Sequence, residues 1–309
     1  MQSLFTTAQM QELDRIAIRE RGIPAQDLME RAAQAVAEAV QKLLFFKPQA
    51  MDETNVTGPM PRVAVFCGPG NNGGDGIAAA RLLRKMGFEI RAFLVGNREK
   101  MTPDARAMEE KLIAHGGVLE PFLPDELLLA WLSACGCMVD ALFGVGLKRP
   151  VVGDFLAAVR IMNRIGCPVV ACDLPSGLNG DTGEVLGEAV KAAVTVTFTC
   201  AKPGLYLGEG GVCAGEVKVT SIGIPDDLVH AVRDSGGEPT EAVGAGRYLL
   251  PCRPRTAHKG NFGRIFILAG SEGYTGAPVL AARAAVRTGA GLVFLGVPRD
   301  IYPIVAVKC

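Results

Sequence analysis

Glycine and polar residues that could bind phosphate gather in the segment Gly68-Pro-Gly-Asn-Asn-Gly-Gly-Asp-Gly76. Glycines let a backbone approach a ligand closely, and free amides at a helix N-terminus attract phosphate. The segment also fits the GxGxxG spacing, but the acid usual about twenty residues further on in dinucleotide-binding folds is missing. The spacing therefore favours a phosphate cradle outside the standard dehydrogenase pattern. A plain tight turn is the alternative, although its two asparagines and its aspartate exceed what a turn needs.

Two further clusters combine glycine with an acid. In Asp140-Ala-Leu-Phe-Gly-Val-Gly-Leu-Lys-Arg-Pro150, Asp140 falls near the end of an apolar run. A carboxyl buried there costs free energy unless it is paired or binds a cation. Lys148 and Arg149 could face phosphate or be ordinary solvated charges. In Asp173-Leu-Pro-Ser-Gly177, Asp173 directly follows an apolar run, where catalytic acids occur in parallel sheets, or it caps a turn.

Strand and helix patterns alternate along the first part of the chain. We expect strands over 63–67, 90–95, 138–143, 169–172, 193–199 and 217–221, and helices over 7–21, 24–44, 77–85, 103–114, 125–135 and 155–165. This order predicts an α/β fold, a doubly wound Rossmann-like parallel sheet with helices on both faces. Ligands bind beyond the carboxyl ends of the strands in such sheets, so the three clusters should meet there.

The pattern changes near residue 234. Residues 234–257 are rich in Gly, Pro, Glu and Arg and have little periodicity, which predicts a linker between residues 1–233 and 258–309. A strand over 264–269, a helix over 277–287 and a strand over 292–297 then make one βαβ unit. Because one unit cannot cover both faces of its sheet, we expect 258–309 to be an incomplete domain of a longer natural chain.

Composition excludes several classes of protein. Hydrophobic residues make up 49% of the chain, enough for a core, and Lys+Arg balance Asp+Glu at 32 each. This balance gives no field of one sign for nucleic acid or a membrane surface. Nine cysteines without a CxxC pair and three scattered histidines favour reduced thiols over zinc. With no signal peptide and no apolar run of membrane length, we expect a cytoplasmic protein, and the leading helices would suit a homodimer.

The three clusters together resemble the NAD(P)HX epimerase family, the YjeF N-terminal type, over residues 1–229. The tail motifs His258-Lys-Gly-Asn-Phe-Gly-Arg264, Ala269-Gly-Ser271, Gly276-Ala-Pro278 and Gly289-Ala-Gly291 resemble the start of an ADP-dependent NAD(P)HX dehydratase domain, which is ribokinase-like. The resemblance implies an isomerase that interconverts the R and S forms of NADHX or NADPHX at C6. It also implies that the longer parent dehydrates the S form as a lyase with ADP or ATP. The dehydratase's catalytic Asp and nucleotide loop would lie beyond Cys309, so this chain is not expected to have that activity.

The same resemblance assigns site residues. The pyrophosphate of the substrate would lie on Asn71, Asn72, Gly73, Gly74 and Asp75, under a segment of Gly144, Val145, Gly146, Leu147, Lys148, Arg149 and Pro150. Asp173 would be the catalytic residue, contacting the hydrated nicotinamide, moving a proton at oxygen and stabilising developing charge. Oxygens of Asn72, Asp140 and Ser176 would bind potassium, a hard cation. Ala277 would contact the substrate of the dehydratase domain.

Other functions remain open at this stage. A non-catalytic nucleotide-binding scaffold could share the fold, although such a protein would have lost Asp173 or the cation oxygens. A phosphoryl transferase of the sugar-kinase kind would need a nucleotide loop that is missing here. A conventional dehydrogenase would need the ribose-binding acid. Both routes of inversion, cleavage of the C6–O bond and opening of the ring, also stay open.

Overall fold

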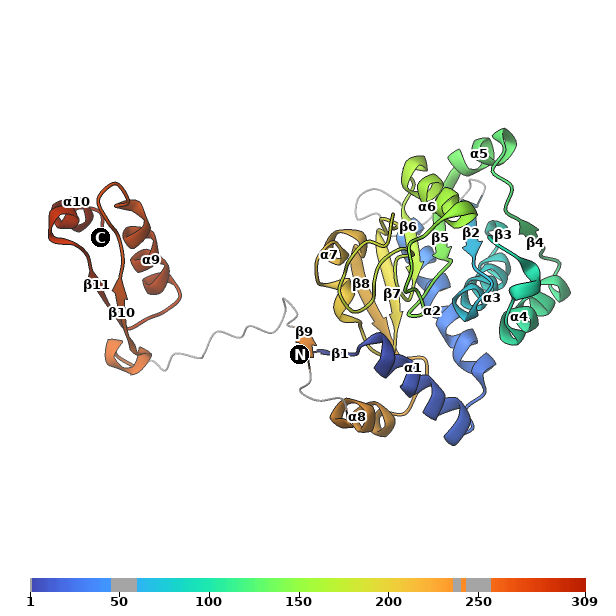
Figure 1. Ribbon diagram of the computed structural model, residues 1–309, viewed down its shortest axis with the longest axis horizontal. Coiled ribbons are helices and arrows are strands. Elements are labelled where there is room, and N and C mark those ends of the chain that lie inside the picture. Colours follow the sequence, from blue (N-terminus) through green and yellow to red (C-terminus); the bar gives the residue numbers. More distant parts are fainter. Residues whose placement is uncertain (1, 46–59, 236–239, 243–256) are drawn as a thin grey trace, which may run out of the picture. The chain divides into compact units, whose positions relative to one another are not determined.

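The computed structural model describes residues 2–45, 60–235, 240–242 and 257–309, which belong to two compact units, Met1–Ala245 and Gly246–Cys309 (Figure 1). Most of the predicted linker lies outside the described residues. No helix in the described ranges is both long and apolar enough to cross a membrane. All eight described cysteines are free thiols, and six of them are buried.

A seven-stranded parallel sheet forms the centre of the first unit. Its strands are β2 (Arg62–Cys67), β3 (Glu89–Leu94), β4 (Leu119–Pro121), β5 (Cys135–Ala141), β6 (Val169–Cys172), β7 (Val194–Phe198) and β8 (Glu216–Thr220). Their order is β4-β3-β2-β5-β6-β7-β8. In chain order this sheet begins with β2, adds β3 and β4 on one side of β2, and continues with β5 on the other side. The predicted doubly wound fold is confirmed, and its topological switch point lies between the adjacent strands β2 and β5, whose following helices pack on opposite faces.

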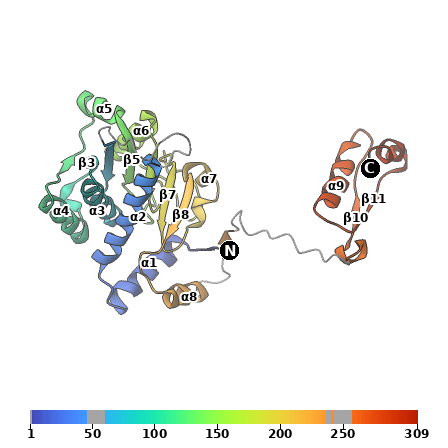
Figure 2. The same cartoon turned by 180° about the vertical axis from the view of Figure 1, so that it is seen from behind.

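Helices cover both faces of this sheet (Figures 1 and 2). Val63, Val65 and Cys67 of β2 pack in one apolar cluster with α2 (Ala25–Phe45), α3 (Asn71–Lys85) and α4 (Pro103–Ala114). The alternate residues Ala64 and Phe66 pack on the opposite face with α5 (Glu126–Ser133) and α6 (Gly153–Ile165). The two faces follow from the two-residue period of a strand.

Helix α3 corrects the sequence-based prediction, because it begins at Asn71 and not at residue 77. Glycine is a poor helix former, so residues 71–76 read as a loop. Packing overrides that preference. A Cβ atom at Gly73 would lie 1.7 Å from the carbonyl oxygen of Gly68, and one at Gly76 would lie 2.4 Å from the Ala141 Cβ. The glycines let the helix start pressed against the ends of β2 and β5.

The N-terminal segment is fastened across the sheet's carboxyl edge. Helix α1 (Thr7–Arg15) continues into a π-helical turn, Ile16–Glu20, which together fill the predicted helix 7–21. The carboxylate of Asp181 accepts hydrogen bonds from the backbone N of Thr7 (2.6 Å) and from its Oγ1 (2.7 Å). Strand β1 (Gln2–Leu4) pairs with β9 (Thr240–Ala242). These two strands, β4, α7 (Gly210–Cys213) and α8 (Asp226–Ser235) were not predicted.

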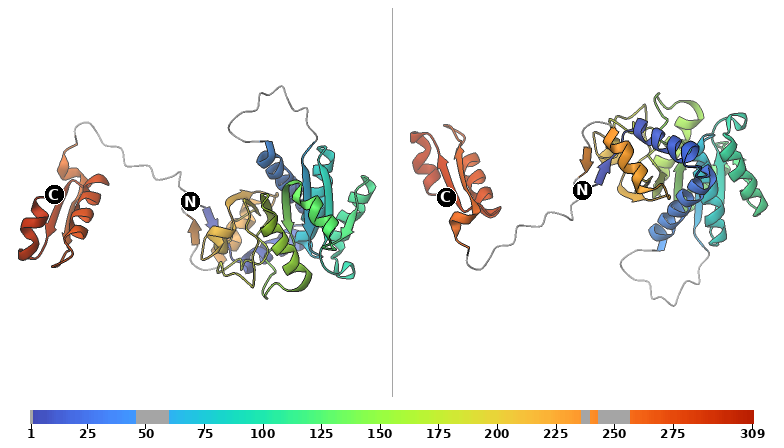
Figure 3. Two further views of the ribbon diagram at one scale, coloured as in Figure 1. Left: turned by 90° about the horizontal axis from the view of Figure 1, so that it is seen from above. Right: turned by 90° about the horizontal axis from the view of Figure 1, so that it is seen from below.

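The second unit contains the predicted strand–helix–strand, formed by β10 (Arg264–Leu268), α9 (Gly276–Arg287) and the parallel β11 (Leu292–Gly296). A short helix, α10 (Tyr302–Ala306), follows. Val279, Ile301 and Val305 form its small buried cluster. Figure 3 shows these elements in orange to red.

Loss of the Asp181 carboxylate should loosen α1. We expect Asp181→Ala to lower the free energy of unfolding by about 2 kcal/mol, since hydrogen bonds to a charged acceptor each contribute about 1.5–3 kcal/mol and part of this is recovered by water. Urea denaturation measures the change. Thr7→Val, which removes one of the two hydrogen bonds, should lose less. Equal stability of Asp181→Ala and wild type would contradict this role.

Candidate active site

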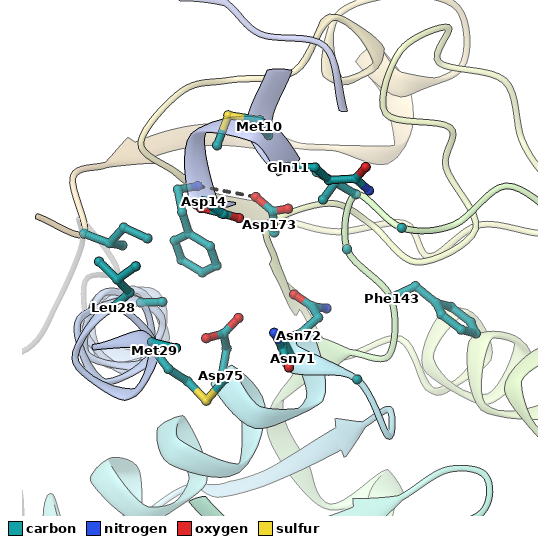
Figure 4. Close-up of a pocket in the computed structure, with 18 of the residues that line it drawn as sticks. Met10, Gln11, Asp14, Leu28, Met29, Asn71, Asn72, Asp75, Phe143 and Asp173 are labelled. Carbon is teal, nitrogen blue, oxygen red and sulfur yellow. Dashed lines mark hydrogen bonds between the residues drawn. The ribbon is translucent and has the colours of Figure 1, made fainter. Parts of the chain in front are cut away.

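A cavity of about 560 Å³ opens at the carboxyl edge of the sheet. Its apolar wall includes Met10, Leu28 and Met29, and its polar side chains come from α1, α3 and the segments after β6 and β7 (Figure 4). These polar residues are Gln11, Asp14, Asn71, Asn72, Asp75, Asp173 and Lys202. The structure therefore brings residues of all three predicted clusters to one place.

The N-terminus of α3 supplies the anion-binding end of the cavity. Gly70 is the N-cap residue and has no side-chain cap, and the first helical hydrogen bond runs from the Gly74 amide to the Gly70 carbonyl (3.1 Å). The amides of residues 71–73 thus precede the helical hydrogen bonds and can bind an anion. The buried side-chain nitrogen of Asn72 has no hydrogen-bond partner within the described residues. These groups fit a bound phosphate chemically.

The second cluster divides into two parts. Gly144, Val145, Gly146 and Leu147 line the cavity. A Cβ atom at Gly144 would lie 3.4 Å from both Asn72 Oδ1 and Asp173 Oδ2, so this segment touches the other two clusters. Lys148, Arg149 and Pro150 do not line the cavity and are exposed. The described part of the chain offers no ion-pair partner to Lys148 or Arg149.

Asp140 and Ser176 contact each other and do not line the cavity, unlike Asn72. Asp140 is fully buried on β5. Its carboxylate accepts from the Ser176 backbone N (2.7 Å), the Ser176 Oγ (2.6 Å) and the Leu142 N (3.2 Å). Burial raises the pKa of Asp140 to about 6, although these hydrogen bonds lower it. Among the described residues no ammonium or guanidinium group compensates this carboxyl.

Asp173 stands in an unusual backbone conformation, with φ +64°. Its amide donates to the Val196 carbonyl (2.8 Å), which holds the turn after β6 against β7. Its Oδ1 accepts from Lys202 Nζ, from Thr197 Oγ1 (3.2 Å) and from the Phe198 N (3.4 Å). Left-handed backbone in a non-glycine residue is uncommon and concentrates at functional sites.

Lys202 completes a buried ion pair that sequence reasoning missed. Its side chain is 1% exposed, and Nζ also donates to Thr197 Oγ1 (2.9 Å). A charge so deeply buried is tolerated only when it is paired and hydrogen-bonded. Its position in the sequence could have identified Lys202 as a site residue, because it follows an apolar strand and therefore lies at the same sheet edge as Asp173.

Asp14 was also missed. It lies beside Leu13 and four residues after Met10, both buried, so it interrupts the apolar stripe of α1. An acid at this position of an apolar stripe was the sequence signal that could have identified Asp14 as a site residue. Burial, and next the charge of Asp173, raise the pKa of Asp14 to about 6, while Lys202 opposes the rise. Burial, then Asp173 and Asp14, raise the pKa of Asp75 well above its usual value.

The two glycines at the start of α3 offer a matched test of the close packing. Gly73→Ala would force its new Cβ against the Gly68 carbonyl, whereas a Cβ at Gly70 meets nothing within 4 Å. We expect Gly73→Ala to lose about 1–3 kcal/mol of unfolding free energy, as overpacking does elsewhere. Because the displaced helix start carries the free amides, anion binding should weaken as well. Gly70→Ala should keep its stability. Urea denaturation and calorimetric titration with inorganic pyrophosphate measure the two effects, and equal losses in both variants would contradict the packing argument.

Each of the two units matches a known protein family. The family described as YjeF-related protein N-terminus matches residues 25–204, more than half of the chain. The family described as NAD(P)H-hydrate dehydratase matches residues 265–308. Among solved structures, the crystal structure of yeast ynu0 (YNL200c) is similar, with TM-score 0.63 and 26% identity, covering 78% of this chain and 97% of that chain.

Similarity to curated proteins extends across both units. The chain is 40% identical over 309 residues to the bifunctional NAD(P)H-hydrate repair enzyme Nnr of Moorella thermoacetica, covering 99% of this chain and 56% of that protein. It is 37% identical over 298 residues to the enzyme of the same name from Thermofilum pendens, covering 96% of this chain and 53% of that protein. The chain thus spans about half the length of these curated relatives.

Proposed function

The chain belongs to the YjeF N-terminal family, and from this premise we propose that its first unit is an NAD(P)H-hydrate epimerase. Its substrates would be NADHX and NADPHX, hydrated at C6 of the nicotinamide ring. The observation that carries the proposal is one cavity that joins the free amides of α3 to the buried Asp173–Lys202 pair. The first feature suits a pyrophosphate, and the second suits a reaction that develops positive charge.

Binding of the substrate would use two chain segments. Residues 71–75 would hold the pyrophosphate at the start of α3, and residues 144–150 would close over it. Lys148 and Arg149 support this assignment because they are exposed and form no ion pair with any described residue, so they are free to meet phosphate oxygens.

Asp173 would act on the hydrated ring. The C6 hydrogen of the hydrate is not acidic, so inversion by proton abstraction at carbon is unfavourable. Departure of the C6 hydroxyl leaves a cation shared by C6 and the ring nitrogen. Asp173 Oδ1 is held by Lys202 and Thr197, whereas Oδ2 lies on the side of Gly144 and is available to stabilise that cation.

A potassium ion would fit the oxygen-rich group under the cavity. Asp140 is a buried carboxyl that forms no ion pair with any described residue, and Ser176 Oγ and the Phe143 carbonyl lie 3.5 Å apart beside it. Oxygen donors of this kind suit a hard cation, which would offset the cost of burying Asp140. Together with Asn72, Asp140 and Ser176 would hold the ion and so fix the segment after β5 against α3.

The second unit would be part of a dehydratase that acts on the S form with ADP or ATP in the complete protein, with Ala277 contacting its substrate. Its match to the dehydratase family and the bifunctional relatives support this. A division into 1–233, a linker of 234–257, and 258–309 stays a prediction, as do the cytoplasmic location and a homodimer.

A stereochemical assay tests the epimerase. Mixed NADHX epimers are first depleted of the S form by an independent dehydratase, and consumption of the R form is then followed with that dehydratase present. The chain should accelerate this consumption. Asp173→Asn should slow it at least about 100-fold with little change in KM, because its charge acts at the transition state.

The matched control is Asp154→Asn, which changes an exposed aspartate in the first turn of α6 and should keep full activity. Thermal melting confirms that each variant is folded. A folded wild type that leaves the R form unaccelerated would overturn the proposed function.

Potassium should stabilise the protein. A ligand that binds only the folded state at one hundred times its Kd adds about 2.7 kcal/mol. We therefore expect a higher Tm in potassium chloride than in choline chloride of equal ionic strength, and no such difference in Asp140→Asn. Asp154→Asn should keep the difference. An identical wild-type Tm in the two salts would count against the site.

A further inference from the structure

Two acids of the cavity, Asp14 and Asp75, have no part in the chemical step as proposed so far, although Asp75 belongs to the segment that would hold the pyrophosphate. Both acids line the cavity and are half-buried, and neither hydrogen-bonds nor ion-pairs with any described residue. Resting on the proposed function, we propose that Asp14 and Asp75 are the acid–base pair of the epimerisation, sharing one proton and serving opposite faces of the nicotinamide ring.

The charge balance of the cavity leads to this assignment. Among its described lining residues are three carboxyls, Asp14, Asp75 and Asp173, and one ammonium, Lys202. Lys202 forms its ion pair with Asp173, and Asp173 Oδ1 also accepts hydrogen bonds from Thr197 Oγ1 and the Phe198 amide. This ion pair suits Asp173 to stabilising positive charge on the ring, and it leaves proton transfer to the other two carboxyls.

Ionisation of both Asp14 and Asp75 would cost free energy. After burial, which is the largest cause for both acids, the charge of Asp173 raises the pKa of Asp14 while Lys202 lowers it, and the charges of Asp173 and Asp14 raise the pKa of Asp75. Burial disfavours charge on each, and neighbouring carboxylates share protons when like charges are close. Burial and the neighbouring carboxylates raise the pKa of both Asp14 and Asp75, which favours retention of a proton by the pair.

The two acids come from different walls. Asp14 extends from α1, beside Asp173, whereas Asp75 rises toward them from α3, with Asn72 next to it (Figure 4). Specific contacts hold both supports in place. Asp181 fastens α1 through Thr7, and close glycine contacts fasten α3. Two walls are what inversion requires, since the hydroxyl leaves one face of C6 and water adds to the other.

The step balances without any co-reactant. The neutral carboxyl protonates the C6 hydroxyl, the C6–O bond breaks with its electron pair on oxygen, and water departs. The lone pair of the ring nitrogen forms the C6=N bond, and its positive charge faces Asp173. A second water adds to the opposite face of C6, the C6=N pair returns to nitrogen, and the ionised carboxyl takes the proton from that water.

This pair suits a reversible inversion. One turnover moves the proton from one aspartate to the other, so the acid for the R form becomes the base for the S form. Each inversion also exchanges the C6 oxygen with solvent. Opening and reclosing of the ring would instead carry the original oxygen into the product.

Single variants test the pair in the full chain with the R-form assay. Asp14→Asn and Asp75→Asn should each lower kcat at least about 100-fold with KM changed less than about 3-fold, as expected for loss of proton transfer. Glu12→Gln changes a neighbouring exposed acid on α1 and should stay active. If the wild type is active and both aspartate variants keep its kcat, the inference is overturned while the proposed function stands.

Two further measurements keep the test independent of folding. The wild-type profile of kcat/KM against pH should be bell-shaped, because the pair works only while it holds one proton. In the residual activity of each Asn variant, one of the two limbs of this pH profile should be missing. In H₂¹⁸O, wild-type product should gain one labelled oxygen per inversion beyond an enzyme-free control. Retention of the original oxygen, or a pH profile unchanged by both substitutions, would overturn the pair.

Discussion

The buried ion pair of Lys202 and Asp173 governs the chemistry of this cavity. Among the described residues that line the cavity, one ammonium can compensate only one of three carboxyls, and the backbone conformation determines which carboxyl it meets. Asp173, with its left-handed backbone, turns its carboxylate toward Thr197 of β7 and Lys202 of the segment after β7, while its own amide donates a hydrogen bond to the Val196 carbonyl. Asp14 and Asp75 form no ion pair with any described residue, so burial and the charge of Asp173 raise the pKa of each.

Close packing of α3 is the second constraint. Gly73 and Gly76 bring the helix against the ends of β2 and β5, so its free amides and Asp75 open into the same cavity. A larger side chain at Gly73 would displace both at once. Phosphate binding and proton transfer would thus rest on one feature, a glycine-rich helix start at the switch point of the sheet.

Most of the sheet and helix order could be predicted from apolar periodicity, and the meeting of the three clusters followed from the parallel sheet. The start of α3 could not be predicted. Local propensity marks its glycines as loop, and only the contact with β2 and β5 makes them helical. Short elements such as β4 and α7 carry too few residues for a pattern.

The sequence by itself determined which segments end at the sheet's carboxyl edge, because strand order along the chain and right-handed crossovers leave few alternatives. It therefore identified Asn72, Asp140 and Asp173 as neighbours. Only the tertiary structure decided how charge is distributed among them. Lys202 and Asp14 are remote in sequence from Asp173, and their effect depends on distance and burial, which the order of residues does not encode.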